Sequence, residues 1–316
     1  MDVDVNSAHA GVELMLSPST MTRFEGCELA WILKNVWRVA GAEESSRVTV
    51  GDLFHLVAAR VGRLVPAERT LDAARRITQE EIMQVSRSAA WQESGFGIDD
   101  ELELGLKVWN LVESWFVMEP VAAAPIVSVE SLVETRVAGV PVRGVIDRAD
   151  QLADGRLVVV DYKTGRAPAG GGYERRLFGV KVYGCALEDM GYEVAELQLI
   201  YVGSGDIIRV TWDAEVSAVT RDAVKDLAGR MAGVLETGSA RAVPGRHCLG
   251  CPYVAVCPAQ GGTLPPPPDV STWAAAATER PLDGPESPVN PEYRGQGHGN
   301  PNGGLRGEIP LFRVGR

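Results

Sequence analysis

The sequence predicts an α/β fold in which a helical N-terminal part precedes a mixed central sheet with flanking helices. Three observations predict it. Apolar side chains recur at helical spacing through residues 21–118, β-branched runs separated by tight turns fill residues 126–165, and helix and strand patterns alternate from there to residue 236.

The composition is that of an ordinary globular protein. The chain has 316 residues, of which 45% are hydrophobic and 23% charged, enough for one large domain or two ordinary ones. It has no unbroken apolar run of about 18 residues, the length that would suggest a membrane span. The N-terminus is acidic where a secretory signal would be basic. We therefore expect a cytoplasmic protein with no membrane segment, in a compartment that keeps thiols reduced.

The N-terminal part carries four helical patterns. Hydroxyl side chains at residues 17–20 supply caps for the first, whose aromatic and aliphatic spacing suits a buried helix. The chain is then interrupted by Pro120 and Pro125. The expected helices cover residues 21–37, 51–64, 71–91 and 100–118.

A β-meander of three strands is expected after the prolines. The segments IVSVESLVETRVA (126–138), VPVRGVIDRAD (140–150) and RLVVVDYKTG (156–165) are rich in β-branched residues and are joined by short Gly-containing turns.

The remaining chain alternates before it loses its apolar pattern. We expect a helix over 173–190, strands at 194–202 and 207–212, and a long amphipathic helix over 213–236 with Asp213 as its N-cap. Residues 244–262 form a cysteine-rich module. The expected organisation is a flexible leader (1–15), one domain (16–262), and a Pro/Gly-rich tail (263–316) too poor in apolar surface to order.

The charge distribution argues against a protein coated in basic surface. The formal net charge is −11, yet the segment 143–181 holds eight Lys and Arg against five Asp and Glu. A solvated face explains such a segment, and so does a locally basic groove for nucleic acid.

Two strands of the meander carry acids that could bind a metal. Asp161 and Lys163 project from one face of their strand because side chains alternate. If the intervening loop is centred on Asp154, Asp147 lies directly opposite Asp161, with Cβ atoms roughly 5 Å apart. Two carboxylates that close repel unless a cation lies between them. A hard divalent ion held there could activate water for attack on a phosphate, with the lysine offsetting developing charge. The alternative is a structural Asp–Lys ion pair.

The GVIDRAD and DYKTG segments resemble the core of the PD-(D/E)XK nuclease superfamily, specifically its RecB-like branch of recombination and CRISPR-associated exonucleases. The resemblance covers residues 16–262 and implies a restriction-endonuclease-like core. It further implies Mg²⁺ or Mn²⁺ bound by Asp147, Asp161 and the carbonyl of Tyr162, with Lys163 as the catalytic lysine. The segment GDLFH is similar to the family's metal-binding histidine motif, which implies His55 as a further ligand.

The activity implied is hydrolysis of DNA, on single strands or ends, in recombination, repair or replication. A degenerate fold that grips DNA or a partner without cutting is the alternative, because Gly179 stands where the family places a glutamine four residues before Tyr183. An additional acid is expected at Glu130 or Glu134. The residues expected to contact DNA are Arg166, Arg175, Arg176, Lys181 and Tyr183.

Four of the five cysteines suggest a metal or cluster site. Cys248, Cys251 and Cys257 form a C-x2-C-x5-C array followed by proline, and Cys27 lies far upstream. Zinc is a rival, with His247 as a possible fourth ligand. Similar RecB-like proteins bind a 4Fe–4S cluster that staples the two ends of the domain, and this resemblance implies all four cysteines as its ligands. We expect the fifth, Cys185, to be a buried small hydrophobe.

The tail ends in a short apolar segment. Residues 308–312 read EIPLF, which resembles peptides that dock on bacterial sliding clamps. A short anchor on a flexible tether suits recruitment. Incidental apolar residues are the alternative.

Overall fold

The computed structural model of the protein describes residues 2–4, 15–39, 48–168, 173–237 and 239–267. Most of the expected leader and the tail from residue 268, including the segment 308–312, lie outside the described residues. The side chain of Arg175 also lies outside them.

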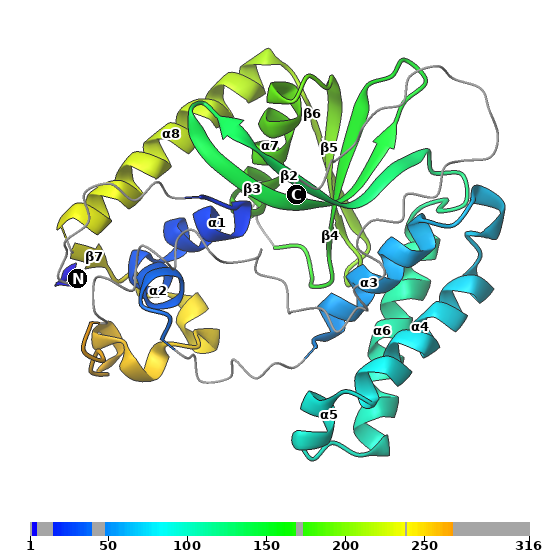
Figure 1. Ribbon diagram of the computed structural model, residues 1–316, viewed down its shortest axis with the longest axis horizontal. Coiled ribbons are helices and arrows are strands. Elements are labelled where there is room, and N and C mark those ends of the chain that lie inside the picture. The colour runs from blue at the N-terminus through cyan, green and yellow to red at the C-terminus, as the bar shows by residue number, and fades with distance from the viewer. Residues whose placement is uncertain (1, 5–14, 40–47, 169–172, 238, 268–316) are drawn as a thin grey trace.

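A five-stranded mixed sheet forms the centre of the molecule (Figure 1). Its order is β2-β3-β4-β5-β6, antiparallel except for the parallel pair of β4 and β5. The predicted α/β class and the three-stranded meander are therefore confirmed. The strands are β2 (Ile126–Val137), β3 (Val140–Gln151), β4 (Leu157–Lys163), β5 (Val194–Tyr201) and β6 (Asp206–Thr211).

Two turns set the register of the meander. β2 and β3 are joined by Ala138 and Gly139, both at positive φ (52° and 84°), the geometry that a two-residue hairpin needs. β3 and β4 pair as Arg148↔Val160 through Gln151↔Leu157, which is the register centred on Asp154. The expected register is thus confirmed, but the ladder ends one residue short of Asp147 and Asp161.

The helices follow the expected order, with two differences of extent. They are α1 (Pro18–Gly26), α2 (Glu28–Trp31), α3 (Val50–Gly62), α4 (Leu71–Ser86), α5 (Ala89–Glu93), α6 (Ile98–Met118), α7 (Glu174–Asp189) and α8 (Ala214–Thr237). As predicted, Asp213 caps α8, its Oδ1 accepting from the N–H groups of Glu215 (3.0 Å) and Val216 (2.9 Å).

The two differences are breaks that the periodicity did not reveal. The single helix expected over 21–37 breaks at Cys27, whose φ of −167° is extended, and continues through α2 into a π-helical turn, Ile32–Val36. The helix expected over 71–91 ends at Ser86. Ser88 then caps α5 by accepting from the N–H of Trp91. In both places a local capping or extended residue overrides a continuous apolar pattern.

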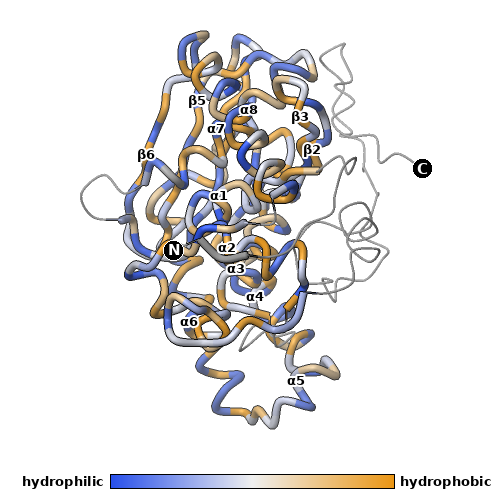
Figure 2. Tube along the Cα trace, turned by 90° about the vertical axis from the view of Figure 1, so that its left-hand side faces the viewer, coloured by the Kyte–Doolittle hydropathy of each residue, from blue (hydrophilic) through white to orange (hydrophobic). Residues whose placement is uncertain are grey.

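Two apolar cores lie on opposite faces of the sheet. Side chains of α1, α7 and α8 pack with Val159 of β4 on one face, and those of α3, α4 and α6 pack with Val158 and Val160 on the other. This follows from the period-two alternation of a strand buried on both faces. Beyond the second core, α4, α5 and α6 extend away from the sheet as an arm with α5 at its end (Figure 2). Within the described residues, no helix combines the length and apolar character needed to cross a membrane.

The C-terminal module brings the two ends of the described chain together. β1 (Asp2–Asp4) pairs antiparallel with β7 (Ser239–Arg241). Short 3-10 turns follow, at Arg246–Gly250, Val254–Val256 and Pro258–Gln260. The module lies beside α2, whose Glu28 carboxylate accepts a hydrogen bond from the backbone N–H of Arg241 at 2.8 Å.

Candidate metal centre

The candidate metal centre lies where β3 and β4 part. Asp147 is the first residue of β3 beyond the paired positions, and Asp161 and Lys163 stand at the end of β4. Lys163 Nζ forms an ion pair with Asp161 Oδ2, so both side chains lie on one face of the strand. The structure therefore has the acid and the lysine arranged as the spacing predicts.

Asp147 connects this strand end to α3. Its Oδ2 accepts a hydrogen bond from the backbone N–H of Tyr162 at 2.7 Å and lies 3.4 Å from His55 Nδ1. The start of α3 is fixed by a capping box between Thr49 and Asp52, which positions His55 in the next turn. The His55 side chain remains 30% exposed, so its ring is still open to a ligand.

Glu130 completes the group. One ligand atom each from His55, Glu130 and Asp147 lie within 4.8 Å of one another, the sole such group of three found among the residues that the structure describes. Glu134, the other candidate acid, instead pairs with Arg143 at 3.5 Å. Of the two acids, Glu130 therefore lies near His55 and Asp147, and Glu134 lies near Arg143.

The backbone at Glu130 is strained. Its φ of 46° places it in the left-handed region, inside a strand and between the paired positions Val129↔Arg148 and Ser131↔Ile146. A non-glycine residue held there costs about 1–3 kcal/mol, and such strain concentrates at functional sites. The strained residue is thus one that lies close to both His55 and Asp147.

The electrostatics of the group favour a bound cation. Burial tends to lower the pKa of His55, but Asp147, Glu130 and Asp161 raise it to about 9. Burial and the charge of Asp147 raise the pKa of Glu130 to about 7. Burial likewise raises the pKa of Asp161, whereas His55 and Lys163 hold that of Asp147 low against its burial. Three acids share one imidazole and one ammonium group, so a divalent cation would relieve their mutual repulsion.

The donor set fits a hard or borderline divalent ion. Carboxylate oxygens suit Mg²⁺ and Mn²⁺, while an imidazole nitrogen is a better ligand for Mn²⁺ than for Mg²⁺. His55, Glu130 and Asp147 could hold such an ion, with Asp161 adjacent.

Tyr183 lies over β3 beside these acids. A Cβ on Gly144 would come within 2.7 Å of the Tyr183 hydroxyl oxygen, so only glycine leaves the ring its place. Burial, followed by the charges of Asp161 and Asp147, raises the pKa of the Tyr183 hydroxyl, which keeps it neutral. A Cβ at position 179, one turn earlier in α7, would meet Pro18 of α1 at 3.4 Å.

The basic segment 143–181 is only partly available to a polyanion. Among the described residues, Arg166 and Arg176 are exposed and form no ion pair, while Lys181 lies 3.6 Å from Glu174. Most of the segment's other cations pair with nearby acids: Arg143 with Glu134, Arg148 with Glu119 and Asp150, Arg156 with Asp154, and Lys163 with Asp161. Most of the local positive charge is therefore neutralised within the fold.

Four cysteines line one pocket at the C-terminal module. They are Cys27, Cys248, Cys251 and Cys257. Cys27 reaches the pocket because the chain is extended between α1 and α2, and its Sγ lies 4.0 Å from the carbonyl oxygen of Arg241. Burial, and then the other three thiols, raise the pKa of Cys251. The fifth, Cys185, is fully buried in α7, where its Sγ contacts the carbonyl of Ser217 at 3.7 Å.

A family of known proteins matches most of the chain. The family model described as the PD-(D/E)XK nuclease superfamily matches residues 15–258. No curated protein matches the chain. The solved structure titled "Crystal structure of SSO0001" matches 69% of this chain and 88% of its own at 18% identity, but its TM-score of 0.32 is too low to support any argument.

The family match spans all five strands of the central sheet. It also includes the residues that gather where β3 and β4 part, which are His55, Glu130, Asp147, Asp161 and Lys163. The chain therefore belongs to the PD-(D/E)XK nuclease superfamily, whose members are generally nucleases that hydrolyse phosphodiester bonds with a divalent metal ion.

Proposed function

We propose that this protein is a metal-dependent DNA exonuclease of the RecB-like kind, acting on single strands or DNA ends in recombination, repair or replication. The observation that carries the proposal is the group of His55, Glu130 and Asp147, with the Asp161–Lys163 pair beside it at the end of β4.

Each residue has a chemical task in this proposal. Asp147, Asp161, His55, Glu130 and the carbonyl of Tyr162 would hold Mn²⁺ or Mg²⁺. The ion would supply Lewis-acid chemistry, polarising the phosphodiester and making water a better nucleophile.

The remaining residues act on water and on the DNA backbone. Lys163, held by Asp161, would orient the attacking water and offset the negative charge that grows on the phosphate oxygens. Arg166 and Arg176 would contact backbone phosphates, with Arg175 and Lys181 as further contacts on the same stretch, whereas Tyr183 is only 8% exposed.

The test is cleavage of end-labelled DNA. Purified protein with Mn²⁺ should shorten labelled single-stranded DNA, and Asp161→Ala should abolish this. Asp154→Ala provides a matched control, because Asp154 is an exposed acid on the same hairpin that pairs only with Arg156. Equal cleavage by wild type and Asp161→Ala would identify a contaminant and remove the proposed site. Double-stranded DNA and RNA, run in parallel, define the substrate.

A non-cleaving DNA-binding protein is the second candidate. Gly179 motivates it, because the glutamine typical of relatives is missing and a Cβ at position 179 would contact Pro18 of α1. In that case wild type and Asp161→Ala would bind single-stranded DNA equally and neither would cut it with Mn²⁺.

We also propose a 4Fe–4S cluster held by Cys27, Cys248, Cys251 and Cys257. All four cysteines line one pocket, and burial, followed by the other three thiols, raises the pKa of Cys251, which supports a shared ligand set for a cluster.

Iron and acid-labile sulfide analysis of anaerobically purified protein decides between cluster and zinc. Four irons per chain and a brown colour support the cluster, whereas a colourless protein with one zinc would exclude it. Such a cluster also suits the cytoplasmic location that we propose, where free thiols persist.

The tail carries a separate proposal. We propose that residues 308–312 dock on a sliding clamp and recruit the nuclease to DNA. Deleting residues 309–312 should abolish clamp binding measured by surface plasmon resonance, and unchanged affinity would dismiss the proposal.

A further inference from the structure

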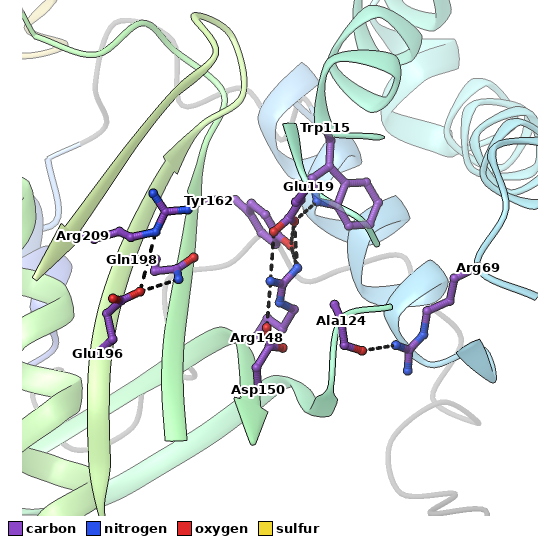
Figure 3. Close-up of polar contacts among 10 residues, drawn as sticks. All are labelled: Arg69, Trp115, Glu119, Ala124, Arg148, Asp150, Tyr162, Glu196, Gln198 and Arg209. Carbon is purple, nitrogen blue, oxygen red and sulfur yellow. Dashed lines mark hydrogen bonds and ion pairs between the residues drawn. The ribbon is translucent and has the colours of Figure 1, made fainter. Parts of the chain in front are cut away.

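A buried ionic cluster lies behind the candidate metal centre (Figure 3). Arg148 is only 3% exposed. Its guanidinium donates to both carboxylate oxygens of Glu119, at 2.8 and 3.0 Å, to Asp150 at 2.9 Å, and to the hydroxyl of Tyr162. The Tyr162 hydroxyl in turn donates to Glu119 at 2.9 Å.

The cluster cannot act on a substrate directly. Arg148 contacts the hydroxyl of Tyr162, whereas Asp147 contacts its backbone N–H, so these two neighbouring side chains reach opposite ends of that residue. Arg148 faces the core formed with α3, α4 and α6, where Tyr162 is 2% exposed. Any effect of Arg148 on the metal centre must therefore pass through another residue.

Stability alone is a weak reason for such a cluster. Taking a guanidinium and two carboxylates out of water costs several kcal/mol per ion, and well-packed apolar residues of similar volume often serve stability equally well. What an ion-pair cluster adds is fixed geometry, because a bidentate arginine–carboxylate pair has few alternative arrangements.

The ionic cluster around Arg148 fixes the position of the Tyr162 side chain. The ring contacts Phe54 and Trp115 edge-on, with centroids 5.7 and 5.8 Å away, and the hydroxyl is held by Arg148 and Glu119. The backbone N–H of the same residue donates to Asp147 at 2.7 Å.

Tyr162 is paired with Ile200 of β5 but lies beyond the last residue pair of the β3–β4 ladder. Pairing between β3 and β4 stops at Arg148↔Val160, so no backbone bond between these strands fixes Tyr162 relative to β3. Two side-chain links join β3 to Tyr162 there, from Asp147 to its N–H and from Arg148 to its hydroxyl.

We infer that Arg148, anchored by Glu119 at the end of α6, is a positioning residue that holds the Tyr162 backbone in place for Asp147 and for the bound cation. The inference rests on the proposed function only in assuming a cation at Asp147, and it assigns a task to residues remote from the reacting atoms.

The sharpest variant is Tyr162→Phe, which removes the hydroxyl and keeps the ring. The structure offers a matched control in Thr78→Val, which removes another buried hydroxyl next to the same core, one that donates to the carbonyl of Ala74 at 2.8 Å. Substituting Arg148 itself would leave Glu119 and Asp150 buried without their paired cation and would destabilise the fold, so Glu119→Gln serves as the second variant.

The decisive readouts do not require cleavage. Hydrogen exchange of the residue 162 amide, followed by NMR, reports the bond to Asp147, and electron paramagnetic resonance of free Mn²⁺ reports affinity for the cation. In Tyr162→Phe and Glu119→Gln, we expect the amide to exchange at least about tenfold faster and Mn²⁺ to bind about tenfold more weakly. Thr78→Val should lower Tm to a similar extent and leave both readouts unchanged.

The outcomes separate this inference from the proposed function. An unchanged residue 162 amide and unchanged Mn²⁺ affinity in both variants would overturn the inference, as would equal changes in Thr78→Val. Suppose that the wild type binds Mn²⁺ more tightly than both variants, and protects the residue 162 amide better, and yet cleaves no nucleic acid. In that case only the proposed function fails.

Discussion

His55 illustrates how strongly single residues at the metal centre depend on their neighbours. It is an imidazole among three carboxylates, and they raise its pKa to about 9 despite its burial. At neutral pH the metal-free histidine is therefore protonated and paired with Asp147. Its ring nitrogen can bind a cation only after that proton has left, so cation and proton compete for one site.

This competition predicts a pH dependence. Between pH 7 and pH 8.5, below the pKa of about 9, each bound Mn²⁺ should displace one proton, and affinity should rise about tenfold per pH unit. Below pH 7, where Glu130 also takes up a proton, the dependence should be steeper. Calorimetric titration with Mn²⁺ in several buffers measures both affinity and protons released.

His55→Asn is the control for that prediction. It should flatten the dependence between pH 7 and pH 8.5 and reduce the preference for Mn²⁺ over Mg²⁺, since an amide oxygen is a harder ligand than imidazole. A wild-type affinity that is constant over this range would contradict His55 as a ligand.

At the scale of elements, α7 and β3 approach each other closely above the acids. The contact depends on Gly144, where a Cβ would lie 2.5 Å from Tyr183 Cε1. Adding one methyl group to such a close-packed contact forces side chain or backbone to move.

Gly144→Ala should therefore displace Tyr183 and widen the contact between α7 and β3. We expect a loss of about 1–3 kcal/mol in the free energy of unfolding, measured by urea denaturation, together with reduced cleavage. Gly229→Ala on the exposed side of α8 is the control, because a Cβ added there would meet nothing within 4 Å and helix propensity favours alanine. Equal stability of wild type and Gly144→Ala would show that Tyr183 is not confined by this contact.

At the scale of the whole molecule, the cysteine pocket joins segments more than 200 residues apart. Cys27 lies between α1 and α2, and the other three pocket cysteines follow β7. A cluster bound by both segments would restrict the unfolded chain and couple the stability of the N-terminal helices to that of the C-terminal module.

Cys27→Ala should therefore lower both the iron content and Tm, measured by metal analysis and by circular dichroism. Cys185→Ala removes a thiol that is buried away from the pocket in α7, so it should retain wild-type iron content even if Tm falls slightly. Full iron occupancy in Cys27→Ala would exclude it as a ligand.

Much of the fold could be predicted from local pattern. The β-branched runs predicted the meander, and the hairpin loop length predicted the register of β3 and β4, which the structure has from Gln151↔Leu157 to Arg148↔Val160. The two-residue alternation placed Asp161 and Lys163 on one face. These features depend on residues close together in sequence, so local sequence specifies them.

Other features were decided only by tertiary packing. Glu130 and Glu134 are four residues apart on one strand, and only the approach of α3 distinguishes the acid near His55 from the acid paired with Arg143. The break at Cys27 interrupts a continuous helical pattern, and it occurs where Cys27 meets the distant C-terminal module. In the sequence, nothing distinguishes Arg148 from the other basic residues of its segment. Its buried pairing with Glu119 depends on the packing of α6 against the sheet.

The sequence by itself determined the strands, their register and the kinds of side chain available for metal and cluster binding. The tertiary structure decided which of those side chains meet, and which charges are buried as fixed pairs instead of facing solvent. The physical reason is that backbone periodicity acts over a few residues, whereas desolvation and ion pairing depend on which distant segments pack together.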